Sequence, residues 1–212
     1  MNILSLEHLT HSYTERKLFD DADFYLHEGD KVGVIGINGT GKSTLLKIMA
    51  GLETPDEGQV IQASNLMIHY LPQNPEFSEE DTVLQSVQNM VHHHANENEL
   101  IAAKAMLTRL GITDFEQKTR ELSGGQRKRL ALVSVLITPC DVLILDEPTN
   151  HLDSEMADWL ENKLQAFRGA LVMVTHDRYF LDSVTNKIIE LDKGKIYSYD
   201  EKYCLLYTSD AA

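Results

Sequence analysis

The chain has 212 residues, 42% of them hydrophobic and 25% charged, which is enough to bury the core of one domain with lobes. Its net charge of −14 argues against binding nucleic acid over the whole surface, although a local basic patch stays open. The apolar stretches are shorter than a bilayer span, and the N-terminus lacks a signal-peptide pattern. Two cysteines, Cys140 and Cys204, make no disulfide framework. We therefore expect a cytoplasmic protein without direct membrane insertion.

Short strands are predicted in the first third of the chain. Residues 3–9, 22–27 and 58–71 carry alternating or short apolar patterns bounded by turns, which predict an antiparallel layer. Residues 31–35 form an apolar strand, and an apolar helix follows from about residue 42.

The segment between that strand and that helix matches the pattern G-x-x-x-x-G-K-[ST] of a phosphate-binding loop. Glycines allow backbone N–H groups to surround phosphate oxygens, and the start of the helix adds positive potential. Lys42 is then placed for the β- and γ-phosphates of a nucleotide and the Ser43 hydroxyl for Mg²⁺. An ordinary glycine turn is the alternative, but it does not explain the whole pattern. The nucleotide-binding residues expected here are Gly36, Asn38, Gly39, Thr40, Gly41, Lys42, Ser43 and Thr44.

The middle of the chain predicts a small helical lobe at about residues 75–135. Helices are expected at 82–91, 97–110 and 125–136, separated by a polar break at 91–98. Three adjacent histidines in this break suggest a metal site, but neighbouring side chains on a helix diverge and no second ligand cluster is near in sequence. A solvated turn is the better interpretation.

Strands and helices alternate in the last third, with strands at 141–146 and 170–174 and helices at 154–167 and from Tyr179. The alternation predicts an α/β fold: a phosphate-loop core whose mainly parallel sheet is covered on both faces, an antiparallel β edge layer and the small helical lobe.

Two acids lie at the end of the strand expected at 141–146. Asp146 is expected to hold Mg²⁺, and Glu147 to polarise the attacking water.

A second segment that can bind an anion lies at the start of the helix expected at 125–136. A serine hydroxyl and glycine N–H groups at a helix start can bind phosphate, although they are also an ordinary way to begin a helix. The residues concerned are Ser123, Gly124, Gly125 and Gln126.

These motifs, taken in order, resemble the ATP-binding cassette (ABC) ATPases over residues 1–203, with ATP and Mg²⁺ as cofactors. By this resemblance Tyr13 stacks on adenine, although a tyrosine packed on the sheet edge is the alternative. Gln73 reaches Mg²⁺ and the lytic water, and His176 contacts the γ-phosphate. Asp153 couples one site to its partner site, and the Ser123–Gln126 segment completes the site of a second, head-to-tail cassette.

The sequences of residues 148–153 and 175–182 are similar to motifs of the ABC-F branch, which implies a ribosome or rRNA partner and a role in translation. ABC-F chains carry two cassettes, so the chain resembles a first cassette that is truncated at its C-terminus. Residues 74–121 leave little room for the helical arm of that branch, and 204–212 are expected to be a non-native or disordered tail. Two alternatives remain: the ATPase subunit of a membrane transporter, and a nucleotide-binding regulator that does not hydrolyse.

Overall fold

The computed structural model describes residues 1–13, 16–90 and 96–200. The chain divides into two compact units, which are taken separately below. Unit 1 comprises residues 1–70, 140–147 and 163 onwards. Unit 2 comprises residues 71–139 and 148–162.

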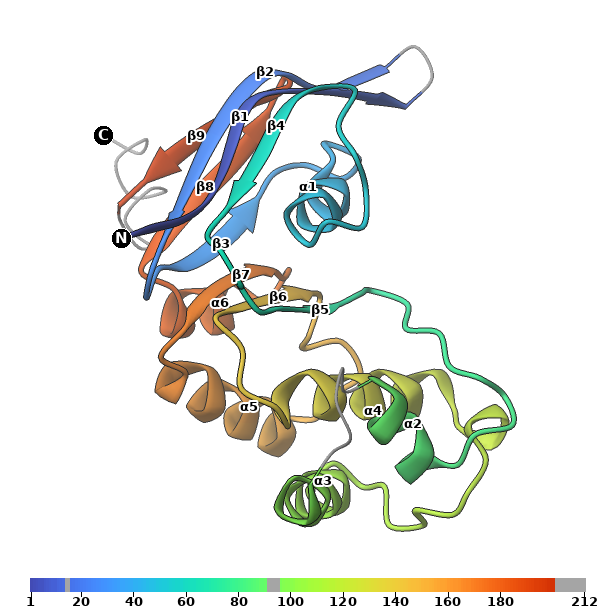
Figure 1. Cartoon of the computed structure of the whole chain (residues 1–212). Coiled ribbons are helices and arrows are strands. Elements are labelled where there is room, and N and C mark those ends of the chain that lie inside the picture. Colours follow the sequence, from blue (N-terminus) through green and yellow to red (C-terminus); the bar gives the residue numbers. More distant parts are fainter. Residues whose placement is uncertain (14–15, 91–95, 201–212) are drawn as a thin grey trace. The chain divides into compact units, whose positions relative to one another are not determined.

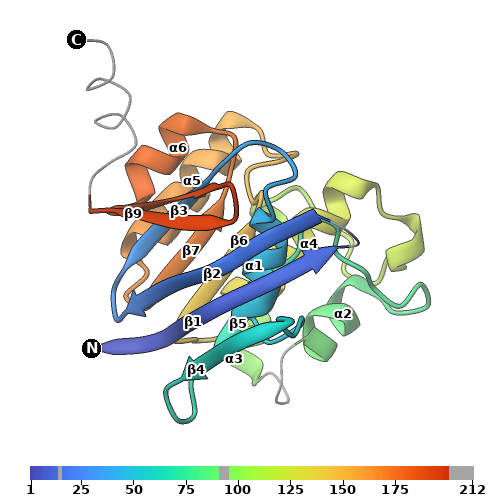
Figure 2. The same cartoon turned by 90° about the horizontal axis from the view of Figure 1, so that it is seen from above.

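Unit 1 contains a three-stranded antiparallel sheet in the order β2-β1-β4 (Figure 2). Its strands are β1 (Asn2–Tyr13), β2 (Arg16–His27) and β4 (Glu57–Gln62). In β2 the residues from Ala22 to Leu26 alternate between buried and exposed, as expected of a sheet with one face on the core.

The second sheet has the order β5-β6-β7-β3-β8-β9 among the described residues. Register pairs show β6, β7, β3 and β8 to be parallel, and β9 antiparallel to β8. Both β6 and β7 are buried at every position, because a parallel strand covered on two faces needs apolar side chains throughout. The strands are β3 (Lys31–Ile35), β5 (Ile68–Leu71), β6 (Val142–Asp146), β7 (Ala170–Val174), β8 (Lys187–Asp192) and β9 (Lys195–Tyr199).

Helices cover both faces of this sheet in unit 1, as the alternation of strands and helices predicted. Figure 1 shows α1 (Lys42–Met49) on the side of the antiparallel sheet and α6 (Arg178–Val184) on the other. A side chain on Gly33 of β3 would place its Cβ 2.7 Å from Leu181 of α6, so glycine permits this close packing. One apolar core joins β1, β2, α1 and the central strands of the larger sheet. This core fixes the C-terminal ends of β3, β6 and β7, near which the phosphate-binding loop, Glu147 and His176 lie.

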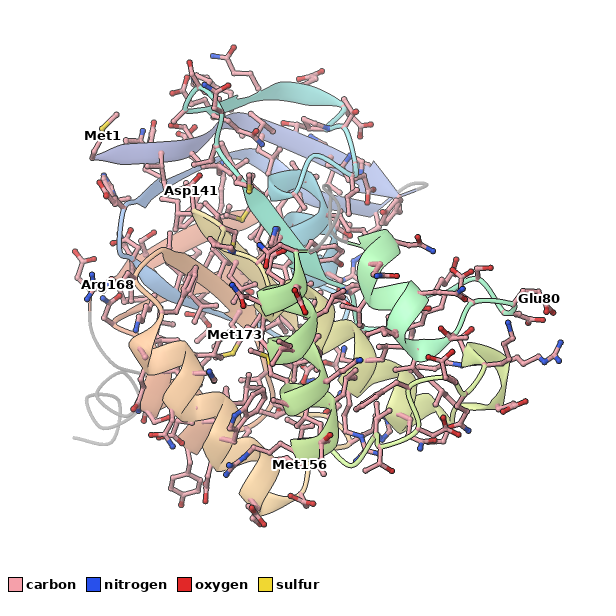
Figure 3. The ribbon with its side chains drawn as sticks, turned by 60° about the horizontal axis from the view of Figure 1, so that its bottom comes forward. Met1, Glu80, Asp141, Met156, Arg168 and Met173 are labelled. Atoms are coloured by element: carbon pink, nitrogen blue, oxygen red, sulfur yellow. The ribbon has the colours of Figure 1, made fainter. Side chains whose placement is uncertain are left out.

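Unit 2 is mainly helical. Its elements are α2 (Val83–Met90), α3 (Glu97–Arg109), the 3-10 helix η1 (Thr119–Glu121), α4 (Gly124–Leu136) and the first part of α5 (Ser154–Ala166). Both α2 and α3 pack against α4. Met156, labelled in Figure 3, lies in the first turn of α5, where its sulfur is 3.6 Å from a guanidinium nitrogen of Arg129 on α4. Helix α4 is therefore the centre of this unit.

The predicted α/β class and most element positions are confirmed, but the prediction for residues 58–71 was wrong in part. This stretch splits into β4 of the antiparallel sheet and β5 of the larger sheet. Asn65 adopts φ 61° in the intervening turn, a left-handed conformation that asparagine tolerates, and so the chain changes sheets. The Asp141 carboxylate (labelled in Figure 3) accepts the Met67 N–H at 2.8 Å and holds the turn against the start of β6.

Two strands were not predicted at all. Strands β8 and β9 extend the parallel sheet beyond α6, with the β8–β9 turn at Lys193 and Gly194, both of which have positive φ. The three adjacent histidines of the polar break, and residues 204–212, lie outside the described residues. Asn96, which was assigned to that break, instead caps α3 and forms a capping box with Glu99.

Candidate active site

The phosphate-binding loop runs from the end of β3 to the start of α1. Gly36 has φ 147°, and a Cβ there would lie 2.8 Å from the Leu191 carbonyl oxygen, so only glycine fits. Gly41 occupies the capping position of α1 with φ 98°. Because glycine has no side chain to cap the helix, the N–H groups of the first turn remain available to an anion.

Lys42 begins α1 and its side chain turns back over the loop. Its Nζ donates to the Gly36 carbonyl at 2.8 Å and to the Ile37 carbonyl at 3.2 Å. Burial lowers the pKa of Lys42, while the charges of Glu147 and Asp146 act in the opposite direction. The ammonium group therefore shares one electrostatic environment with both acids.

Asp146 ends β6 and Glu147 follows it, with only 2% and 4% of their surfaces exposed. Glu147 has φ 53°, a strained conformation for a residue with a side chain, and its N–H donates to the Val174 carbonyl at 2.9 Å. The pKa of Glu147 is raised, mainly by burial and to a smaller extent by the negative charge of Asp146. The charge and the backbone N–H of His176, and the charge of Lys42, lower this pKa and so oppose the shift. A carboxylate with a raised pKa is a better proton acceptor than an ordinary surface glutamate.

His176 follows β7 and faces this carboxylate. Its Nε2 is 3.3 Å from one carboxylate oxygen of Glu147, and its backbone N–H donates to the other at 3.4 Å. The imidazole is otherwise 70% exposed. His176 and the loop also line a common pocket of about 220 Å³, together with Thr175, Arg178 and Glu190. The structure thus brings together the loop, Lys42, Glu147 and His176.

Tyr13 lies at the last position of β1, and the residue is 48% exposed. Its hydroxyl donates to the carboxylate of Glu53. This hydrogen bond and burial raise the pKa of Tyr13, and a hydrogen bond with Thr44, near the start of α1, lowers it. Tyr13 is therefore attached to the same helix that begins at the phosphate loop.

The remaining predicted residues belong to unit 2, and three of the predicted segments meet there. A pocket of about 230 Å³ is lined by Gln73, Gly124, His151 and their neighbours. Ser123 caps α4: its Oγ accepts the Gln126 N–H at 3.2 Å, and the Gln126 side chain accepts the Ser123 N–H at 3.0 Å. A Cβ on Gly125 would lie 3.3 Å from the Cβ of His151, whereas Gly124 is open. This segment is a preformed helix start.

Asp153, expected to couple two sites, has a local partner in unit 2. Its carboxylate accepts the Met156 N–H at 2.9 Å, which caps the start of α5.

Sequence reasoning missed two residues that hold site elements in place. Glu53 binds Tyr13 from 40 positions away. Lys128 of α4 is only 3% exposed, and its Nζ donates to the Pro72 carbonyl at 2.9 Å and the Gln73 carbonyl at 3.0 Å. No local pattern indicates either contact, because each depends on how distant segments pack.

The described residues contain no cluster of three or more His, Cys, Asp or Glu side chains arranged to hold a metal ion. This agrees with the way Mg²⁺ binds in nucleotide sites, through one or two carboxylates together with water and substrate phosphates. The buried Asp146 carboxylate and the Ser43 hydroxyl, both in unit 1, fit that donor set.

The glycine loop with its lysine, the buried acid pair after β6 and the parallel sheet define a phosphate-loop nucleotide-binding domain. Residues 19–150 match the profile of the family described as ABC transporter, and the chain belongs to this family. At this general level it is an ATP-binding cassette of the ATPase class.

Two relatives and one solved structure illustrate the similarity. The chain is 40% identical over 240 residues to the uncharacterized ABC transporter ATP-binding protein YfmR of Bacillus subtilis, covering 96% of this chain and 38% of that protein. It is 35% identical over 227 residues to the energy-dependent translational throttle protein EttA of Escherichia coli K12, covering 89% of this chain and 41% of that protein. The chain thus spans about two fifths of the length of these relatives.

One solved structure of similar fold is the ATP-binding cassette MJ0796, solved as a dimer in a post-hydrolysis state with ADP and Pi. It superposes with a TM-score of 0.77 at 23% identity, covering 93% of this chain and 98% of that one, and so supports the fold. No helix in the described part of the chain has both the length and the apolar character needed to cross a bilayer.

Proposed function

We propose that the chain is an ABC-F type cassette that binds ATP and hydrolyses it to ADP and phosphate in the presence of Mg²⁺. The observation that carries this proposal is the position of Glu147. Its carboxylate is buried, has a raised pKa and lies 3.3 Å from the imidazole of His176, beside the phosphate-binding loop. These are the properties required of a group that accepts a proton from water.

The phosphate-binding loop is proposed to bind the nucleotide. Backbone N–H groups from Gly36 to Ser43 surround the β- and γ-phosphates, with Asn38, Thr40 and Thr44 contributing from the loop and the helix start. Lys42 exchanges its two carbonyl partners for phosphate oxygens, which carry more negative charge and make stronger hydrogen bonds.

For hydrolysis, Glu147 accepts a proton from a water molecule as the oxygen of that water attacks the γ-phosphorus, and the bond to the bridging oxygen of ADP breaks. The His176 imidazole can donate to the transferring phosphoryl group and keeps the carboxylate of Glu147 oriented. Mg²⁺, when bound, neutralises charge on the β- and γ-oxygens. Asp146, Ser43 and Gln73 are the residues proposed to hold it.

A second cassette is proposed to complete the site. Ser123 to Gln126 start α4, and an anion at a helix start is favoured by the open N–H groups and the helix dipole. A γ-phosphate held by one cassette would therefore attract this segment of another. The second cassette would come from another copy or from the remainder of a protein of the length of the relatives. The dimeric MJ0796 cassette supports this arrangement by analogy of fold.

The proposed place of action is the ribosome, in the cytoplasm. The similarity to a translational throttle protein and the ABC-F-like sequence of residues 148–153 support this role. The alternative is the ATPase subunit of a membrane transporter, which the name of the family profile and the name of the Bacillus relative favour. Sedimentation of the protein with ribosomes in ATP, but not in ADP, would support the ABC-F role. Recovery with a membrane-spanning partner instead would support the transporter.

Phosphate release tests the enzymatic proposal. The purified chain is incubated at high concentration with ATP, with Mg²⁺ or with EDTA. We expect phosphate release only with Mg²⁺, and a rate that rises more than linearly with protein concentration, because two cassettes must meet. A rate strictly proportional to protein concentration would contradict the shared site.

A further inference from the structure

A buried group of polar side chains lies at the end of β1, outside the phosphate loop. His11 and Glu53 have 7% and 18% of their side chains exposed, and the His11 Nε2 is 2.9 Å from Oε1 of Glu53. The Tyr13 hydroxyl donates to the same oxygen. One carboxylate oxygen thus fixes two aromatic rings of β1.

The ring of Tyr13 contacts His11, and its hydroxyl contacts Glu53. His11 packs against it edge-to-face, with ring centroids 5.2 Å apart and planes at 77°. Thr44 of α1 makes a further hydrogen bond to the phenol oxygen. The tyrosine nevertheless remains 48% exposed, so a large part of its apolar surface is open.

The backbone beneath the ring is fixed independently. Tyr13 pairs with Arg16 of β2, and the Ser12 N–H donates to the Asp56 carboxylate at 2.8 Å. Removing the Glu53 carboxylate would therefore free the ring while the strand itself stays in place. The position of the strand and the orientation of the ring have separate causes.

We propose that Glu53, supported by His11, is a positioning residue that holds the ring of Tyr13 as a preformed platform for the purine base of the nucleotide. The proposal rests on the proposed nucleotide-binding function and names residues that assist it. A tyrosine has few rotatable bonds, and fixing them before binding removes an ordering cost that the nucleotide would otherwise bear. The hydrogen bond to Glu53 is the main cause of the raised pKa of the Tyr13 hydroxyl.

The test compares the affinity for ATP with that for inorganic tripolyphosphate, which has phosphates but no base. Calorimetry is carried out on the parent chain, Glu53→Ala, Glu53→Gln, Tyr13→Phe, Tyr13→Ala and the double variant Glu53→Ala/Tyr13→Phe. Loss of base stacking in Tyr13→Ala should weaken ATP binding by roughly 5- to 100-fold. Loss of the hydrogen bond between Tyr13 and Glu53, which Glu53→Ala and Tyr13→Phe both remove, should weaken it by about 3- to 10-fold. Tripolyphosphate should bind all variants equally.

Two comparisons separate positioning from general support of the fold. Glu53→Gln, which keeps an acceptor for the hydroxyl, should restore most of the affinity. In the Tyr13→Phe background, Glu53→Ala should have almost no further effect, because the hydroxyl through which it acts is already missing. Glu28→Ala, which removes an exposed carboxylate from a turn of unit 1, is the matched control.

The possible failures are distinguishable. If Tyr13→Ala binds ATP as the parent does, the proposed role of Tyr13 in nucleotide binding is wrong. If Tyr13→Ala weakens ATP binding but Glu53→Ala does not, the positioning role is wrong while the nucleotide site stands. Equal loss of ATP and tripolyphosphate affinity in Glu53→Ala would also overturn the positioning role, since it would mean that the variant disturbs the loop.

Discussion

The two units differ in what they do with their polar residues. In unit 1 the acids of the site are buried and interact with one another: Asp146 and Glu147 are almost inaccessible, and Glu147 has a strained backbone and a raised pKa. In unit 2 the residues of the helix start at Ser123 satisfy one another through a capping box. The acids of the site in unit 1 thus lie in an energetically costly environment, which suits chemistry, whereas the helix start at Ser123 in unit 2 is unstrained, which suits recognition.

Among the predicted effects, the largest is the loss of ATP affinity expected from Lys42→Ala in unit 1. Without the ammonium group, the loop of unit 1 loses its charge-assisted hydrogen bonds to phosphate, each of which contributes about 1.5–3 kcal/mol. We expect ATP affinity to fall by roughly 100-fold in calorimetry. Lys47→Ala, an exposed lysine on the same helix, should bind ATP as the parent does. Similar affinities for both variants would show that Lys42 does not contact the phosphates.

A smaller effect is expected from Lys128→Met, a substitution in unit 2. The methionine fills the same space but cannot donate to the carbonyl groups of Pro72 and Gln73, which costs about 1–3 kcal/mol. Hydrogen exchange of residues 71–75 should become faster, and hydrolysis should slow while ATP affinity is kept. Lys104→Met, on the exposed side of α3, is the control. Unchanged exchange at residues 71–75 would mean that Lys128 does not hold the Gln73 loop.

The smallest effect concerns the stability of unit 1 and its dependence on pH. The folded-state pKa of Glu147 is raised, mainly by burial, so its protonated form is favoured by folding. Its contribution to stability is complete below the unfolded pKa and is lost as the pH rises through the folded pKa. Glu147→Gln should therefore melt at a higher temperature than the parent at neutral pH, and this gain should shrink as the pH falls. A gain that is constant over this range would contradict the raised pKa.

Local motifs made the core of the site predictable from the sequence. Gly36 to Ser43 are contiguous, and Asp146 and Glu147 directly follow an apolar run, so their neighbourhood follows from the chain itself. His176 was assigned by the resemblance to the ATP-binding cassettes, and its position after β7 agrees with a site at the carboxyl ends of parallel strands. Their chemical roles stay predictions.

Contacts that depend on packing could not be predicted. Nothing in the composition of residues 58–71 indicates that this stretch contains two strands that belong to different sheets. The bond from Tyr13 to Glu53 and the burial of Lys128 depend on how segments 40 and more than 50 positions apart meet. The strands β8 and β9, which follow α6, were not predicted.

The most direct test of the central claim is the rate of ATP hydrolysis by Glu147→Gln, measured together with ATP retention. The amide keeps the shape of the side chain but cannot accept the proton from water. We expect ATP to stay bound and the rate to fall by about 10²- to 10⁴-fold relative to the parent. Glu155→Gln, which changes an exposed glutamate of α5, should hydrolyse ATP at the parent rate. Hydrolysis by Glu147→Gln at nearly the parent rate would show that Glu147 is not the base.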